Sequence, residues 1–159
     1  MAATATAQRC LTAVVLLLSA HAALAAPTAD LWPRWQAQQA GSKLSVDHSR
    51  WEQFLQQYVR ASADGINRVA YGSVGTTGLQ QIAFYLARMQ EVQVSALRRE
   101  EQRAYWINLY NAATVQPVLG NYPVDSILKI SISPGLFTRG PWGKKMLKIE
   151  GEALSLDDI

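Results

Sequence analysis

The sequence predicts an α+β fold in which one buried helix is accompanied by two amphipathic helices and a small sheet of short strands. Three observations lead to this prediction. Residues 97–119 carry apolar side chains on every side of a helical projection, two other stretches repeat apolar residues at helical spacing, and several short runs alternate as strands do. A helix that is apolar all round is a buried helix, and a chain of this length makes one ordinary domain.

The first 25 residues differ in kind from the rest. Arg9 precedes an uncharged run rich in Leu, Val and Ala, residues 11–25, which ends in Ala-Leu-Ala. This pattern is typical of a secretory signal peptide, so we expect residues 1–25 to be cleaved and the protein to be periplasmic or secreted. The alternative is an uncleaved anchor, but the run is short for a membrane span of about 20 residues, so we expect no integral span after cleavage.

Removal of the signal peptide would limit the chemistry of the remaining chain. Cys10 is the only cysteine, and without His21 the only histidine would be His48. The remaining chain would then have no disulfide, no thiol nucleophile and no Cys–His zinc site. We therefore expect no cofactor and no metal. The formal net charge of +3 indicates no particular partner.

Residues 26–45 are rich in Pro, Ala, Gln, Gly and Ser and predict an extended leader before the domain. Its Trp32 and Trp35 either form a contact patch or, as is more common, pin the leader to the domain. The first helix is expected to begin near Asp47. Its buried face is formed by Trp51, Phe54, Leu55, Tyr58 and Val59. His48 is either a general base or ligand, or a neutral residue of the capping region; the helix dipole disfavours its charged form, which favours the second interpretation.

The region after the first helix predicts a turn at Asp64-Gly65, a strand over residues 66–71 and a glycine-punctuated loop. Gly72, Gly75 and Gly78 match neither a dinucleotide fingerprint nor a P-loop, so a flexible connection is favoured over a phosphate cradle. The second amphipathic helix is predicted from Leu79, Ile82, Ala83, Leu86 and Met89.

The central helix, residues 97–119, contains two asparagines that share one face. Asn108 and Asn111 are spaced i, i+3, and a buried amide without partners costs about 1–3 kcal/mol. They either point into a pocket or tie loop backbones to the core, and the second role is the more common. Glu100 and Glu101 are adjacent and point about 100° apart, so they are interpreted as charges at the helix end rather than as an acid–base pair.

The C-terminal third predicts extended structure. Pro117 should kink or end the central helix, and residues 127–133 and 144–149 alternate as strands do. The charges between Asp125 and Glu150 are all positive and lie among aromatic residues. Nucleic acid, anionic lipid or an acidic glycan could meet such a stretch, but a solvated strand face is favoured, and we expect no nucleic acid partner.

Ser155 to Asp158 has the pattern of a capping box, in which a serine and an acid three residues later satisfy the first turn of a helix. The helix that this pattern predicts would begin where the sequence ends. We therefore expect residues 46–159 to be the N-terminal part of a single α+β domain that continues beyond Ile159.

Four segments together resemble a known family, the domain of unknown function 547. They are AYWINLYNAATVQPVLGNYPVDSI from Ala104, VDHSRWEQFLQQYV from Val46, NRVAY from Asn67 and GEALSLDDI from Gly151. The WINLYNA run, residues 106–112, is the most specific of these. Two positions depart from the family pattern: Ala70 stands where members carry an acid, and Pro117 stands where they carry an ordinary helix former.

The resemblance implies no established activity. It implies a domain that continues past Ile159, where any catalytic Cys or His of the family would lie. It also selects Trp106, Asn108, Tyr110 and Asn111 as candidate binding residues.

Two functions from different classes therefore stay open. The favoured one is an exported binding or accessory module of the cell envelope, whose partner is an envelope ligand or protein and whose oligomeric state the sequence does not predict. The alternative is a hydrolase-like enzyme acting on peptide or glycan, with catalytic residues largely beyond Ile159 and with Asn108 and Asn111 orienting them.

Overall fold

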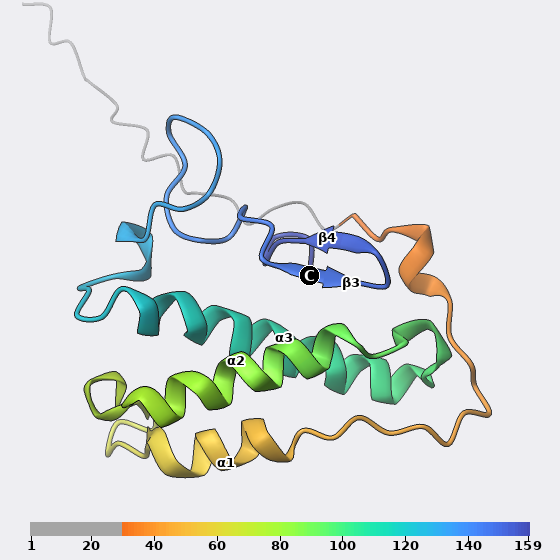
Figure 1. The fold of residues 1–159 in the computed structure, drawn as a ribbon, viewed down its shortest axis with the longest axis horizontal. Coiled ribbons are helices and arrows are strands. Elements are labelled where there is room, and N and C mark those ends of the chain that lie inside the picture. Colours follow the sequence, from red (N-terminus) through yellow and green to blue (C-terminus); the bar gives the residue numbers. More distant parts are fainter. Residues whose placement is uncertain (1–29) are drawn as a thin grey trace, which may run out of the picture.

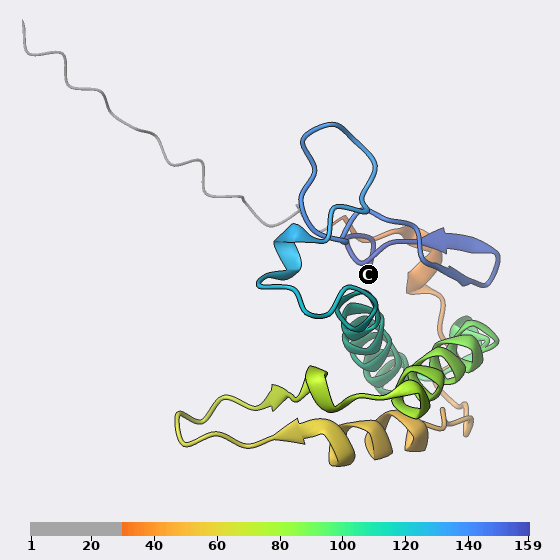
Figure 2. The same ribbon diagram turned by 60° about the vertical axis from the view of Figure 1, so that its left-hand side comes forward.

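The computed structural model describes residues 30–159; the predicted signal peptide, residues 1–25, lies outside the described residues. Three helices form the body of the molecule: α1 (Ser49–Tyr58), α2 (Thr76–Gln90) and α3 (Arg99–Gly120). They lie side by side, and α2 contacts both α1 and α3 (Figure 1). Figure 2 looks almost along α3, with the other two helices on one side of it.

Two small antiparallel sheets complete the fold. In the first, β1 (Val59–Arg60) pairs with β2 (Arg68–Val69). In the second, β3 (Leu147–Ile149) pairs with β4 (Glu152–Leu154), and β3 also contacts α2. The predicted α+β class is confirmed, although the strands form two separate pairs rather than one sheet.

The aromatic side of α1 packs onto α2, as its spacing predicts. Trp51, Phe54 and Tyr58 are buried, and the rings of Trp51 and Phe54 stack with centroids 5.5 Å apart. The backbone N–H of Ser49 donates to Asp47 Oδ1 at 2.9 Å, which satisfies one free amide at the start of the helix. Burial of such rings is the main favourable contribution of this helix to folding.

Gly78 is not part of a flexible loop, as the sequence suggested, but a buried residue in the first turns of α2. A Cβ placed there would lie 2.6 Å from Val74 Cγ1 and 3.0 Å from the Tyr58 ring. The glycine therefore lets α1 and α2 approach closely. Its role is steric and could not be read from its spacing to Gly72 and Gly75.

The prediction that α3 is buried on every side is wrong. One side of α3 is buried, and Tyr105, Leu109 and Ala112 there are fully inaccessible to solvent. On the opposite side Ile107 is 54% exposed. Apolar residues on all sides of the helical projection therefore do not mean that every side is buried. The rest of the core covers only one part of the surface of α3.

The segment before α1 is attached to the start of α3. A 3-10 helix, Pro33–Gln36, places Trp35 edge-on against Trp106, with ring centroids 5.2 Å apart. Arg99 Nη2 donates to the carbonyl of Gln36 at 2.8 Å. These contacts agree with the interpretation of the leader tryptophans as residues that pin the leader to the domain.

The strand predicted over residues 127–133 is absent. Residues Ile127–Lys129 form a 3-10 helix, and the backbone N–H of Leu128 donates to Ser126 Oγ at 3.3 Å. Ile132 N donates to the carbonyl of Ile130 at 3.0 Å, a local turn contact. Alternation alone does not make a strand, and the bonds of this segment are local because no neighbouring strand pairs with it in the described part of the chain.

The serine and acid of the predicted capping box do bond to each other in both directions. Ser155 N donates to Asp158 Oδ2 at 2.6 Å, and Asp158 N donates to Ser155 Oγ at 3.3 Å. The aspartate also forms an ion pair with Lys145 at 2.5 Å. These bonds close the turn that follows β4 and fix it to the segment leading into β3.

Candidate functional site

The four candidate residues of α3 lie in two different rows of the helix. Trp106 and Tyr110 are spaced i, i+4 and form one row, whereas Asn108 and Asn111 are spaced i, i+3 and form another. The two rows face different directions around the axis. The structure therefore brings the asparagines together with Ile107, and it does not bring all four candidates to one point.

Trp106 and Tyr110 are half-buried and pack against the core. The Trp106 ring meets Tyr105 edge-on at 5.0 Å as well as Trp35. The Tyr110 carbonyl accepts a hydrogen bond from Thr114 Oγ1 at 2.8 Å within the helix. The Trp106 ring is thus held between Trp35 and Tyr105, and the Tyr110 side chain packs against the core.

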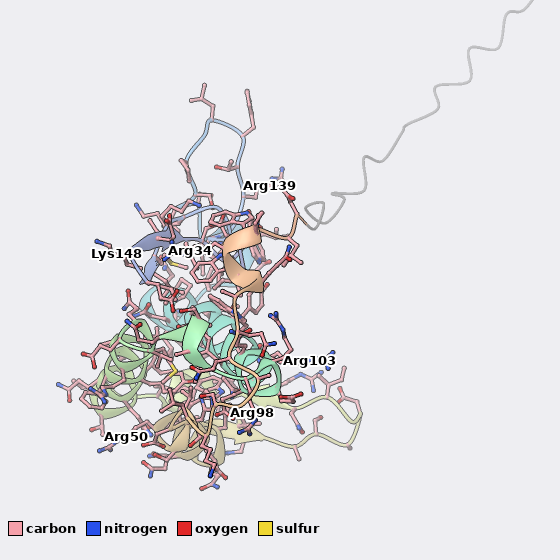
Figure 3. All side chains as sticks on the ribbon, turned by 90° about the vertical axis from the view of Figure 1, so that its right-hand side faces the viewer. Arg34, Arg50, Arg98, Arg103, Arg139 and Lys148 are labelled. Atoms are coloured by element: carbon pink, nitrogen blue, oxygen red, sulfur yellow. The ribbon has the colours of Figure 1, made fainter. Side chains whose placement is uncertain are left out.

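Asn108 is half-buried and Asn111 is exposed. The expectation that both are buried amides is therefore wrong. Among the described residues, the one buried side-chain polar atom without a hydrogen-bond partner is Nε2 of His48, so neither asparagine carries an unpaired buried amide. We call Arg103, Ile107, Asn108 and Asn111 the α3 outer face. Figure 3 shows Arg103 on the outside of the molecule.

The buried amide of α3 is Gln102, which sequence reasoning missed. Its side chain is 2% exposed, and Nε2 donates to the carbonyls of Ala37 and Val94, each at 2.8 Å. Its Oε1 accepts from Arg99 Nη1 at 2.8 Å. This one amide joins the leader, the segment before α3 and α3 itself. The loop-tying role that the sequence assigned to the asparagines is filled by Gln102, which lies earlier in α3 than Asn108 and Asn111.

Two carboxylates bind backbone N–H groups of other segments. One is Glu101 in the first turn of α3, and the other is Glu150 in the turn between β3 and β4. Glu101 Oε1 accepts from the backbone N–H of Val46 at 2.8 Å. Glu150 Oε1 accepts from both the N–H and the hydroxyl of Ser95, each at 2.8 Å. Neighbouring Glu100 faces solvent, which agrees with its interpretation as an end charge. Within residues 30–159, no three His, Cys, Asp or Glu side chains are grouped so that they could hold a metal ion.

His48 precedes α1 and reaches the core rather than the surface. Its Nδ1 and the hydroxyl oxygen of Tyr85 are hydrogen-bonded at 2.7 Å, and its Nε2 is buried without a partner. Burial lowers the pKa of His48, against a weaker opposing effect of the Glu101 and Asp47 carboxylates. Burial likewise raises the pKa of Tyr85. The neutral form expected from the sequence is thus favoured by desolvation of the imidazole ring.

His48 should make the stability of the protein depend on pH. Because its pKa is lower in the folded state, the unfolded chain takes up a proton first as the pH falls below about 6.5, the ordinary value. The free energy of unfolding should therefore be highest above that pH and should fall as the pH decreases toward the folded-state pKa. Urea denaturation between pH 7.5 and pH 5 measures this slope.

The matched variant is His48→Gln, which cannot titrate. Its unfolding free energy should be lower at pH 7.5 and should change less between pH 7.5 and pH 5 than that of the unmodified protein. An equal slope in both proteins would show that His48 does not carry the pH dependence.

The comparisons with known proteins concern the second half of the chain. Residues 94–159 match the family model described as "Protein of unknown function, DUF547". This region contains α3 with the WINLYNA run and the β3–β4 pair; α1, α2 and the two N-terminal segments of the resemblance lie before it. No curated protein and no solved structure matched the chain. No helix within residues 30–159 combines the length and hydrophobicity of a membrane span.

The family resemblance is therefore confirmed over one continuous region: residues 94–159, from the segment before α3 to Ile159, match the DUF547 family.

Proposed function

We propose that the protein is exported to the cell envelope and acts there as a binding or accessory module, through the α3 outer face. The observation that carries this proposal is the combination of an apolar side chain and two amides on one open side of α3. Ile107 is 54% exposed, Asn111 is exposed and Asn108 is half-buried at the edge of this face. All three belong to the DUF547 region.

This arrangement is suited to a polypeptide partner. Arg103, Ile107 and Asn111 are spaced i, i+4 and i+8 and so lie along one side of α3, where Ile107 is the apolar anchor that a groove on another protein could receive. Ile107 would supply apolar contact area, and the amides would supply directional hydrogen bonds. The opposite side of α3 is held by Gln102 and Tyr105, so the helix is fixed before a partner arrives.

A site-specific photo-crosslinker tests the binding role in cells. Benzoylphenylalanine at position 107 should give a discrete adduct with a polypeptide, and the adduct should weaken strongly when Asn111→Arg is added. The matched control is the same crosslinker at Leu136. This side chain is 95% exposed, but it lies in the loop between α3 and β3 and not on the α3 outer face. Adducts of equal yield at both positions, or none at position 107, would overturn the α3 proposal.

Export is tested separately. Residues 1–29 fused to an alkaline phosphatase that is active only outside the bacterial cytoplasm should give active enzyme. Replacing Leu16, Leu17 and Leu18 in the uncharged run by Asp should abolish that activity. An inactive fusion with the unmodified segment would contradict export. It would not affect the interpretation of the crosslinking experiment, which tests the α3 outer face alone.

A further inference from the structure

A second surface, remote from the α3 outer face, lies between α1 and α2. The two helices border a shallow, open groove, whose lining includes Arg50, Gln53 and Gln57 of α1 and Gln80, Gln81 and Phe84 of α2. Both helices precede the region that matches DUF547. Figure 3 shows Arg50 beside these helices, well separated from Arg103 of α3.

The groove is unusual in the chemistry of its lining. Arg50 is its only charged side chain, and the other polar side chains are amides and one hydroxyl. Solvated helix faces commonly carry Lys, Glu and Arg, whereas a surface of amides offers donors and acceptors without net charge. Such a lining fits a ligand that also presents many neutral donors and acceptors.

Phe84 adds a flat apolar surface to these amides. Its side chain is 54% exposed, and the Arg50 guanidinium lies 5.7 Å from the centre of its ring. Gln81 Nε2 donates to the carbonyl of Arg50 at 2.9 Å, so α1 and α2 are tied together at this point. The two helices that carry the aromatic ring and the cation over it are thereby joined at the groove.

From this combination we propose that the α1–α2 groove binds a neutral oligosaccharide. A sugar ring has an apolar C–H face that stacks on an aromatic ring, and its rim of hydroxyl groups both donates and accepts hydrogen bonds. Phe84 matches the first feature, and the glutamines match the second. A highly anionic polymer is a poorer fit, because one arginine cannot neutralise several negative charges.

Titration calorimetry with chitotetraose and maltotetraose tests the proposal on the full chain. At least one of these neutral tetrasaccharides should bind saturably with a stoichiometry of one. Phe84→Ala should weaken that binding about tenfold or more. Because Phe84 is largely exposed, this variant should keep the unfolding transition of the unmodified protein.

The matched control is Leu79→Ala, an exposed apolar residue of the same helix that does not line the groove. It should leave the sugar affinity unchanged. A heparin tetrasaccharide should bind more weakly than the neutral sugar. The proposal is overturned if neither neutral sugar binds, if Phe84→Ala and Leu79→Ala have the same effect, or if only the anionic sugar binds.

Discussion

Tyr105→Ala is expected to lower the free energy of unfolding by about 4 kcal/mol. The Tyr105 side chain is 0% exposed, its ring meets Trp106 at 5.0 Å, and its hydroxyl donates to the carbonyl of Met89 at 2.8 Å. The substitution would leave a cavity between α2 and α3, and the Met89 carbonyl would keep only the backbone N–H groups of Glu91 and Val92. Urea denaturation followed by circular dichroism measures the loss.

Two companion variants separate the causes of this effect. Tyr105→Phe keeps the ring and removes only the hydroxyl, so it should lose about 1 kcal/mol. Ile107→Ala, on the outer face of the same helix, should lose less than about 1 kcal/mol because its side chain is 54% exposed. If Tyr105→Ala and Ile107→Ala were equally destabilising, the two sides of α3 would not differ as described.

Gln102→Leu is the second substitution with a large expected effect, about 2 kcal/mol of unfolding free energy. Leucine has a volume close to that of glutamine, so packing is largely retained. The loss comes from the carbonyls of Ala37 and Val94, which each lose a donor at 2.8 Å. The Val94 carbonyl keeps the backbone N–H of Leu97 at 3.1 Å, so the Ala37 carbonyl is the one left without its donor. An unpaired carbonyl costs about 1–3 kcal/mol.

Gln116→Leu is the control for this prediction, because Gln116 is an exposed glutamine of the same helix. It should change the unfolding free energy by less than about 0.5 kcal/mol. Limited proteolysis gives a second measurement: the leader of the Gln102→Leu protein should be cut faster than that of the control. Equal stability and equal cutting rates in the two variants would show that Gln102 does not fasten the leader.

The helices could be predicted from the sequence because their periodicity is long and regular. Trp51, Phe54 and Tyr58 recur at helical spacing and do form the buried side of α1. The strand over residues 127–133 could not be judged in the same way. A strand needs a partner as well as alternation, and the partner of a short segment is set by tertiary structure.

The candidate site shows the same limit. The sequence indicated that α3 carries polar side chains among apolar ones, and this is correct. It did not show that Gln102 is buried while Asn111 is exposed, because apolar residues on all sides of α3 left no pattern that separates a covered from an open side. Gly78 is similar: only the closeness of Val74 and Tyr58 explains the need for glycine.

The central claim is that α3 has one side built into the core and one side open for binding. Introduced cysteines test it directly, since Cys10 is the only native cysteine and can be replaced by serine. In the folded protein, Ile107→Cys and Asn111→Cys should react with a thiol reagent about a hundredfold faster than Leu109→Cys and Ala113→Cys, which replace buried residues. Equally slow reaction at all four positions would contradict the account.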